Sequence, residues 1–147
     1  LIVTVEHLEY LNTLLHTNGD VLHLGVKIHL KAVLLAESLN LLAGFLLRVP
    51  EEIISAFPEK IINIHPSLLP KHGGKGMYGM HVHEAVVADG DKESGITIHY
   101  VNENLDEGAI IFQAKCEVLP TDTPEDVAGK VHELEYKFFP EVIEKLI

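Results

Sequence analysis

Residues 61–70 read Ile-Ile-Asn-Ile-His-Pro-Ser-Leu-Leu-Pro, and the fold is best worked out from this stretch. The apolar, largely β-branched residues 61–65 predict a buried strand, and Pro66 ends it because proline cannot donate to a central sheet ladder. Asn63 and His65 are two positions apart, so their side chains project from the same face of the strand. Open α/β sheets bind ligands beyond the C-terminal ends of parallel strands, so we expect a ligand site here.

The segments around this strand predict alternating strands and helices. Upstream, the apolar run 41–47 predicts another buried strand, and a short helix starts at Pro50 and ends at Phe57-Pro58. Downstream we expect a Pro/Gly-rich loop over 66–80, a helix over 82–88, strands over 95–101 and 109–118, a polar loop over 102–108, and a terminal helix. The pattern predicts an α/β fold with three layers: a mainly parallel twisted sheet with helices on both faces.

The expected terminal helix has a clear start and an internal proline. Thr123-Pro124-Glu125-Asp126 combines a capping hydroxyl, a proline at the first helical position and an acid three residues after the cap. Pro140 is expected to kink or interrupt this helix, since proline removes a helical hydrogen bond.

Composition narrows the class of protein. The 147 residues are 47% apolar, which fits a single domain over 1–147. With 22 acidic and 11 basic side chains the net charge is −11, which disfavours binding to nucleic acid or to a membrane surface. Cys116 is the single cysteine, so a reducing compartment is expected, with the cytoplasm as the default. The sequence has no apolar run long enough for a membrane span and no signal-peptide pattern.

Several polar residues are candidates for chemistry. Asn63 and His65 cost a few kcal/mol to desolvate unless they are paired, so a strand built only for stability would avoid them. A carboxylate such as Asp106 beside a histidine would stabilise the imidazolium, which suits a proton carrier. Thr97 and His99 form a second polar pair on one side of the next strand. The alternatives are that His65 bonds only to backbone, that loop 102–108 is a solvated turn, and that Thr97 and His99 serve the core.

Other motifs are weaker. Gly73-Gly74-Lys75-Gly76 lacks the Gly-Lys-Ser/Thr of a phosphate-binding loop and is interpreted as a flexible loop. The whole connection over 66–80 is long and without regular structure, and such loops in a compact domain are more often functional than not. His81 and His83 lack the further ligands of a zinc site, so no metal is expected. Cys116 lies on an apolar strand and is interpreted as a packed thiol.

The stretch Asn63 to Pro70 resembles the signature of the folate-dependent formyltransferases. Further matching segments appear in the same order over about the last 105 residues: Leu42-Ala43-Gly44-Phe45, Gly95 to His99, Leu105 to Gly108, and Glu135. The resemblance implies a Rossmann-like formyltransferase fold. It also implies transfer of a formyl group from 10-formyltetrahydrofolate, as co-substrate, to the amine of glycinamide ribonucleotide in purine biosynthesis, without a metal.

The resemblance also implies site residues. Asn63 would stabilise the developing oxyanion, His65 would carry the proton, and Asp106 would orient His65 and raise its pKa. Glu135 and His132 would contact the ribonucleotide. The folate would be held by Leu46, Leu47, Arg48, Val49, Asn63, Val101, Asn102, Glu103 and Asp106. The expected partners are therefore small molecules, with no nucleic acid and no membrane, and the protein is expected to be a monomer or homodimer.

Other activities of the same family remain open. A formyltetrahydrofolate deformylase would use water as the nucleophile, although Ser67 after His65-Pro66 favours the transferase. A methionyl-tRNA formyltransferase would need a basic surface, which this acidic chain lacks. A non-catalytic ligand-binding domain of the same fold is a further alternative.

The first 40 residues do not fit the resemblance. Family members open with a Gly/Ser/Asn loop that binds phosphate at a helix N-terminus, and residues 1–40 have none. Because the sequence also begins at Leu1, we expect the N-terminal part to be incomplete and the natural polypeptide to be longer.

Overall fold

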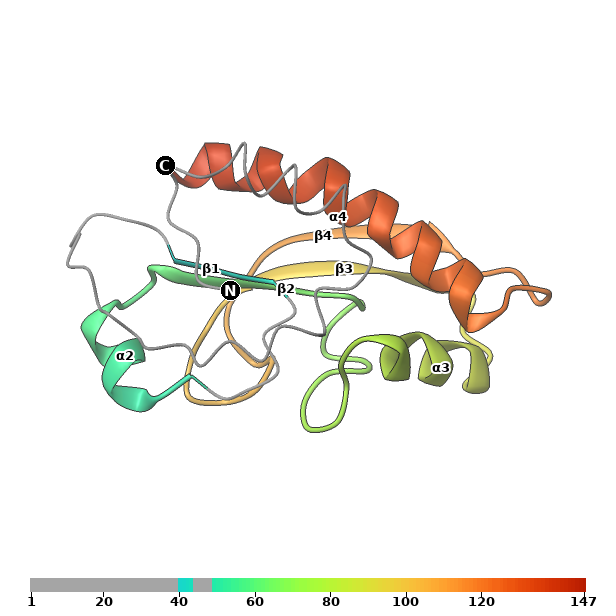
Figure 1. The fold of residues 1–147 in the computed structure, drawn as a ribbon, viewed down its shortest axis with the longest axis horizontal. Helices are drawn as coiled ribbons and strands as arrows, with labels where there is room; N and C mark the ends of the chain where they lie inside the picture. Colours follow the sequence, from blue (N-terminus) through green and yellow to red (C-terminus); the bar gives the residue numbers. More distant parts are fainter. Residues whose placement is uncertain (1–39, 44–48) are drawn as a thin grey trace, which may run out of the picture.

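The computed structural model describes residues 40–43 and 49–147, which form a sheet flanked by helices (Figure 1). In chain order the elements are β1 (Asn40–Ala43), α2 (Glu51–Ala56), β2 (Ile61–His65), α3 (Met80–Ala88), β3 (Glu93–Tyr100), β4 (Ile110–Glu117) and α4 (Pro124–Leu146). Each falls within a few residues of its predicted position. The expectations for residues 1–39 and 44–48 lie outside the described residues.

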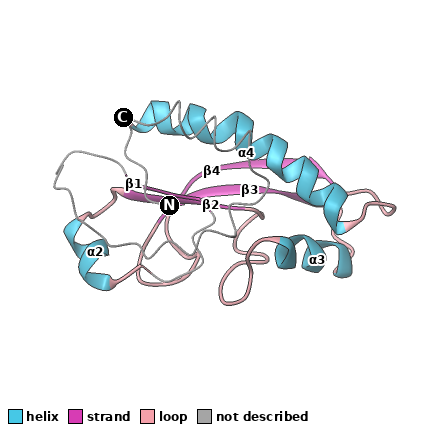
Figure 2. Cartoon of the chain, viewed as in Figure 1, coloured by secondary structure: helices cyan, strands magenta, loops and turns pink. Residues whose placement is uncertain are grey.

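The described strands form one sheet in the order β1-β2-β3-β4. β1 pairs with β2 in parallel, whereas the β2–β3 and β3–β4 pairings are antiparallel. The predicted α/β fold is confirmed (Figure 2), but among these four strands only the first pairing is parallel, where a mainly parallel sheet was expected. For β3 and β4 the physical reason is connection length, because loop 101–109 is too short for the crossover that a parallel pair would need.

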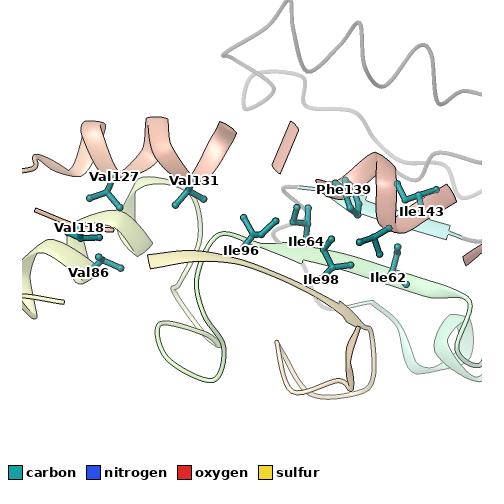
Figure 3. Close-up of a cluster of buried hydrophobic side chains, with 11 residues drawn as sticks. Ile62, Ile64, Val86, Ile96, Ile98, Val118, Val127, Val131, Phe139 and Ile143 are labelled. Carbon is teal, nitrogen blue, oxygen red and sulfur yellow. The ribbon is translucent and has the colours of Figure 1, made fainter. Parts of the chain in front are cut away.

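One face of the sheet packs against α4. Alternate residues of β2 and β3 point to this helix, because side chains alternate between the faces of a strand. Figure 3 shows that α4 contributes side chains from both halves of its length. The buried cluster is Ile62, Ile64, Val86, Ile96, Ile98, Val118, Val127, Val131, Phe139, Val142 and Ile143.

Helix α4 begins as predicted but does not break at its proline. Thr123 and Asp126 form a capping box, in which each residue's side chain accepts a hydrogen bond from the other's backbone N–H. Of the kink or interruption expected at Pro140, the interruption does not occur, because the helix runs unbroken from 124 to 146. Phe139 and Val142 flank the proline and are buried in the core, so packing offsets the lost hydrogen bond.

The opposite face of the sheet is polar over β2 and β3 and apolar where α2 lies. Val49 and Ile61 are buried there against the partly buried side chains of α2. No helix in the described part of the chain is long and apolar enough to cross a membrane.

Candidate active site

The polar face of the sheet brings two pairs of side chains together. Asn63 of β2 lies opposite His99 of β3, and His65 lies opposite Thr97. His65, Thr97 and His99 are buried, with exposed fractions of 4% or less. This register places the two polar pairs side by side on neighbouring strands.

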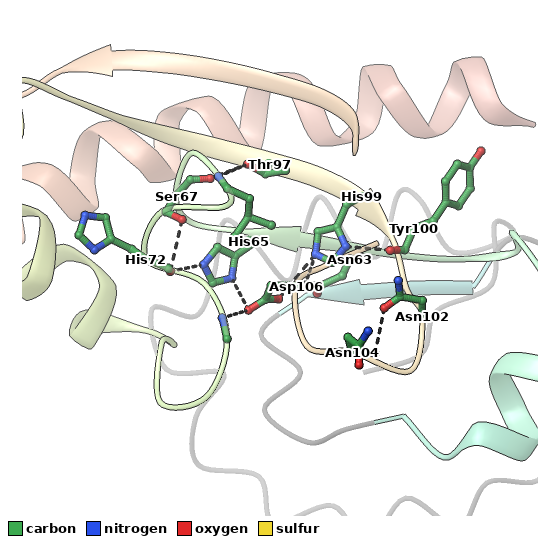
Figure 4. A network of polar contacts seen from close by, with 12 residues as sticks. Asn63, His65, Ser67, His72, Thr97, His99, Tyr100, Asn102, Asn104 and Asp106 are labelled. Atoms are coloured by element: carbon green, nitrogen blue, oxygen red, sulfur yellow. Dashed lines mark hydrogen bonds and ion pairs between the residues drawn. The ribbon is translucent and has the colours of Figure 1, made fainter. Parts of the chain in front are cut away.

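Asp106 reaches the two histidines from the loop after β3. Its Oδ2 is 3.5 Å from Nδ1 of His65, and its Oδ1 is 3.6 Å from Nε2 of His99 (Figure 4). The backbone N–H of Gly74 donates to Oδ2 over 2.8 Å. Asp106 has φ of 58°, a left-handed conformation that is uncommon outside glycine and that clusters at functional sites.

Backbone carbonyls decide which ring nitrogens carry protons. Nε2 of His65 lies 2.7 Å from the carbonyl oxygen of His72, and a carbonyl only accepts, so Nε2 is protonated. Nδ1 of His99 is protonated for the same reason, because it lies 2.8 Å from the carbonyl oxygen of Tyr100. In neutral His99, Nε2 is therefore an acceptor, and Nδ2 of Asn63 donates to it over 3.3 Å. In neutral His65, Nδ1 is the nitrogen free to take a proton, and it faces Asp106.

Burial and charge act on His65 in opposite directions. Burial lowers the pKa of His65 below its usual 6.5, and the carboxylate of Asp106 partly offsets this. Asp106 thus acts in the expected direction and raises the pKa of His65, but desolvation outweighs this attraction, so the net shift is downward. Burial alone would raise the pKa of Asp106, but the contacts with His99, Gly74 and His65 lower it. At neutral pH the site holds a neutral imidazole beside a carboxylate.

Thr97 holds the loop that follows β2. Its Oγ1 donates to the carbonyl oxygen of Ser67 over 2.6 Å and accepts from the backbone N–H of Leu69 over 3.0 Å. Nε2 of Gln113, on β4, donates to the same Oγ1 over 2.8 Å. Through its bonds to the backbone of Ser67 and Leu69, Thr97 holds loop 66–79 in place beside the site.

Of the described residues assigned to the folate, Val49 and Val101 pack in one cluster with side chains of α2. The others lie on β2 (Asn63) or in loop 101–109 (Asn102, Glu103 and Asp106). Val49 is buried against Ile61, and the backbone N–H of Val101 donates to the Ile61 carbonyl oxygen over 2.9 Å. Asn102 accepts from the backbone N–H of Asn104 over 2.9 Å, and Glu103 is exposed. Leu46, Leu47 and Arg48 lie outside the described residues.

Glu135 and His132, assigned to the ribonucleotide, lie together on α4. Oε2 of Glu135 and Nε2 of His132 are 4.0 Å apart. Burial raises the pKa of Glu135 to about 7 and lowers that of His132. Within the described residues no hydrogen bond or ion pair joins them to Asn63, His65 or Asp106.

His83 of α3 interacts with a residue of each group: its ring is close to that of His132, and it interacts electrostatically with His65. Its ring centroid is 6.4 Å from that of His132, and its Nδ1 is buried without a hydrogen-bond partner among the described residues. Burial lowers the pKa of His83 to about 4, with further contributions from His132 and His65.

The length of the loop after β2 indicated a functional role, but sequence reasoning did not predict its contacts with Asp106 and His65. The glycine-rich stretch was interpreted as a flexible loop, yet Gly74, with φ of 85°, turns its N–H onto Asp106. His72 supplies the carbonyl that holds His65. The run of glycines was the available signal, because glycine permits both positive φ and close approach of the backbone. Across residues 40–43 and 49–147, no three His, Cys, Asp or Glu side chains are grouped to hold a metal ion.

Comparison with known proteins places this arrangement in a family. The family model described as "Formyl transferase" matches residues 27–143. Over 103 residues the chain is 50% identical to the chloroplastic phosphoribosylglycinamide formyltransferase of Arabidopsis thaliana, covering 70% of this chain and 35% of the plant protein. Over 109 residues it is 42% identical to the phosphoribosylglycinamide formyltransferase of Haemophilus influenzae, covering 74% of this chain and 49% of the bacterial protein.

Solved structures agree with the sequence matches. The phosphoribosylglycinamide formyltransferase of Anaplasma phagocytophilum superimposes with a TM-score of 0.67 at 39% identity, over 74% of this chain and 50% of that one. The chain thus spans half or less of the length of each of these relatives.

Proposed function

The chain belongs to the formyl transferase family, and from this we propose that it transfers a formyl group from 10-formyltetrahydrofolate to the amine of glycinamide ribonucleotide. The observation that carries the proposal is the meeting of Asn63, His65 and Asp106 on one face of the sheet. These side chains supply a neutral donor, a proton acceptor and a carboxylate, the groups that acyl transfer to an amine needs.

Asn63 stabilises the charge that develops on the formyl oxygen. An amide nitrogen carries two N–H groups, and His99 takes one of those on Nδ2 of Asn63, which fixes the orientation of the amide. Among the described residues no acceptor is recorded for the second N–H, which can donate to the formyl oxygen. A donor fixed before the reaction stabilises the transition state without reorganisation.

His65 moves the proton from the incoming amine to the departing folate nitrogen. The amine nitrogen forms a bond to the formyl carbon and gives up a proton, which Nδ1 of His65 accepts while Asp106 stabilises the imidazolium. The bond from the formyl carbon to the folate nitrogen then breaks, and that nitrogen receives the proton. A neutral histidine can accept before it donates, which is why the lowered pKa of His65 suits this role.

The binding regions follow from the same arrangement. We assign the folate to the region of Val49 and loop 101–109, and the ribonucleotide to Glu135 and His132. Glu135 has a pKa of about 7, so its carboxyl group either accepts or donates a hydrogen bond near neutral pH, which suits recognition of hydroxyl groups. The expected compartment, the cytoplasm, and the expected state, monomer or homodimer, stay predictions.

An assay with and without the amine tests the proposed reaction. Purified protein is incubated with 10-formyltetrahydrofolate, and formylated ribonucleotide and free formate are measured separately, with Asp106→Asn as the inactive control. We expect formylated product only when glycinamide ribonucleotide is present. Formate release at the same rate without the amine would show a deformylase instead.

A further inference from the structure

A cluster of charged side chains ties loop 66–79 to the turn after α3. Nε2 of His72 lies 2.7 Å from Oδ2 of Asp91, and the ammonium group of Lys71 bonds to Oδ1 of the same carboxylate. The side chain of His72 is 8% exposed and that of Asp91 is 16% exposed, so the contact between them is shielded from water. We name His72 and Asp91 the loop clamp.

The loop clamp and the active site meet at the backbone of His72. The ring of His72 points away from His65, whereas its carbonyl oxygen accepts from Nε2 of His65 (Figure 4). His72 has φ of 53°, in the left-handed region that residues with a Cβ rarely occupy. Such a conformation persists only where surrounding contacts hold it, and the contact of its ring with Asp91 is one that does so.

Ser67, near the start of loop 66–79, also contacts the backbone of Lys71 and His72. Oγ of Ser67 donates to the carbonyl oxygen of Lys71 over 2.7 Å, and it lies 3.4 Å from that of His72. Ser67 therefore limits where the carbonyl can move, but it does not hold the ring or the backbone angle of His72.

The position of this carbonyl decides the state of His65. While it accepts from Nε2, the lone pair of neutral His65 stays on Nδ1, facing Asp106 at 3.5 Å. If the carbonyl turned away, the proton would move to Nδ1 to bond Asp106, and Nδ1 could no longer accept a proton.

We infer that Asp91 is a positioning residue for His65, acting through the ring and the backbone carbonyl of His72. Its effect on turnover rests on the proposed formyl transfer, but its effect on the protonated nitrogen of His65 does not.

Three variants of the full chain test this role. Asp91→Ala removes the clamp, and Asp91→Asn keeps an oxygen that accepts from Nε2 of His72. Asp89→Ala is the matched control, because Asp89 carries the same charge in the same turn but lies 3.9 Å from Nε2 of His72, beyond hydrogen-bond distance. Nitrogen-15 NMR of the His65 ring reads which nitrogen is protonated, and steady-state kinetics give kcat and KM.

We expect Asp91→Ala to shift the His65 proton from Nε2 towards Nδ1 and to lower kcat about 10-fold to 100-fold with little change in KM, since small displacements of catalytic groups have effects of this size. Asp91→Asn and Asp89→Ala should keep the wild-type ring spectrum and kcat within about threefold. If Asp91→Ala does not fold, loss of the Nε2 signal in Asp91→Asn would overturn the inference.

The outcomes separate the two proposals. Wild-type ring signals in folded Asp91→Ala would overturn the positioning role, whatever happens to kcat. A shifted ring spectrum in a protein whose wild type transfers no formyl group would support the positioning role and contradict the proposed function.

Discussion

His65 is the residue at which burial, hydrogen bonding and charge meet. Burial favours the neutral ring, the His72 carbonyl selects the nitrogen that carries the proton, and Asp106 stabilises the charged ring once a proton arrives. Each influence comes from a different segment of the chain. A histidine placed in this way is neutral at rest and can be protonated during a reaction.

Single substitutions of the three central residues should each remove most of the turnover. We expect Asn63→Ala, His65→Ala and Asp106→Ala to lower kcat by about 10²-fold to 10³-fold, because oxyanion stabilisation and proton transfer are each worth that much. Steady-state kinetics on protein whose cooperative unfolding has been verified measure the effect. Since the groups act as a unit, the double Asn63/His65 variant should lose less than the product of the single losses. Near-normal turnover in any single variant would remove that residue from the mechanism.

Glu135 should make the protein less stable at alkaline pH. Its pKa is raised to about 7 in the native state from an ordinary 4.5, so its contribution to stability falls as pH rises through this window. Glu135→Gln, which stays neutral, should be more stable than wild type by about 2 kcal/mol at pH 8 and no more stable at pH 4. Urea unfolding at the two pH values measures the difference. An equal effect at both would show that Glu135 is not held neutral by burial.

The residues of the site differ in how far sequence could predict them. Asn63 and His65 can be recognised from the local sequence, because burying two polar side chains in an apolar strand is costly unless they are paired. Asp106 could be paired with His65 through the family resemblance. His72 acts on His65 through its backbone carbonyl, and Asp91 contacts the ring of His72 from 19 residues further along the chain. No local sequence pattern predicts either contact.

At the scale of elements, the capping box of α4 should contribute measurably to stability. Oγ1 of Thr123 accepts from the backbone N–H of Asp126 over 3.2 Å, so Thr123→Ala leaves that N–H without its partner. We expect a loss of about 1 kcal/mol in the free energy of unfolding, the usual value for a helix cap. Thr121→Ala, two residues earlier and also exposed, is the control. Equal losses in both variants would contradict a capping role.

The elements themselves were predicted well where local chemistry decides them. Strand β2 and the start of α4 depend on β-branched residues, proline and a cap, all of which are visible in a short window. The interruption expected at Pro140 does not occur, and the buried residues beside it pack in a core with strands far away in the sequence. The antiparallel pairing of β2 with β3 could not be predicted from a short window either, because the relative direction of the two strands depends on the path of the connection over residues 66–92.

At the scale of the whole molecule, buried histidines should make the protein sensitive to acid. Burial lowers the pKa of His83 from 6.5 to about 4, so the unfolded chain takes up this proton first as pH falls. The contribution of His83 is complete above about pH 6.5 and is lost progressively as pH falls towards 4. Glu135 has the opposite trend over part of this range, so a variant is needed to isolate His83.

His83→Leu should flatten the pH dependence of stability. The variant removes the titrating ring and keeps a buried side chain of similar size, so we expect the loss of unfolding free energy between pH 7 and pH 4 to shrink by about 2 kcal/mol. The control is His81→Leu on the same helix, because the side chain of His81 is 59% exposed. Denaturant titrations at several pH values measure both. An unchanged slope in His83→Leu would show that His83 is freely hydrated.

The hydrogen bond from the Gly74 N–H to Asp106 joins the two loops of the site, so its breaking can be measured in the absence of substrate. Loop 66–79 and loop 101–109 are separate stretches of backbone, and the Gly74 N–H is held by the carboxylate only while both are in place. Exchange of that single amide proton for deuterium therefore requires either that the two loops separate or that the hydrogen bond to the carboxylate breaks. Its exchange rate would time the opening of the site, and a ligand that binds across both loops would slow it.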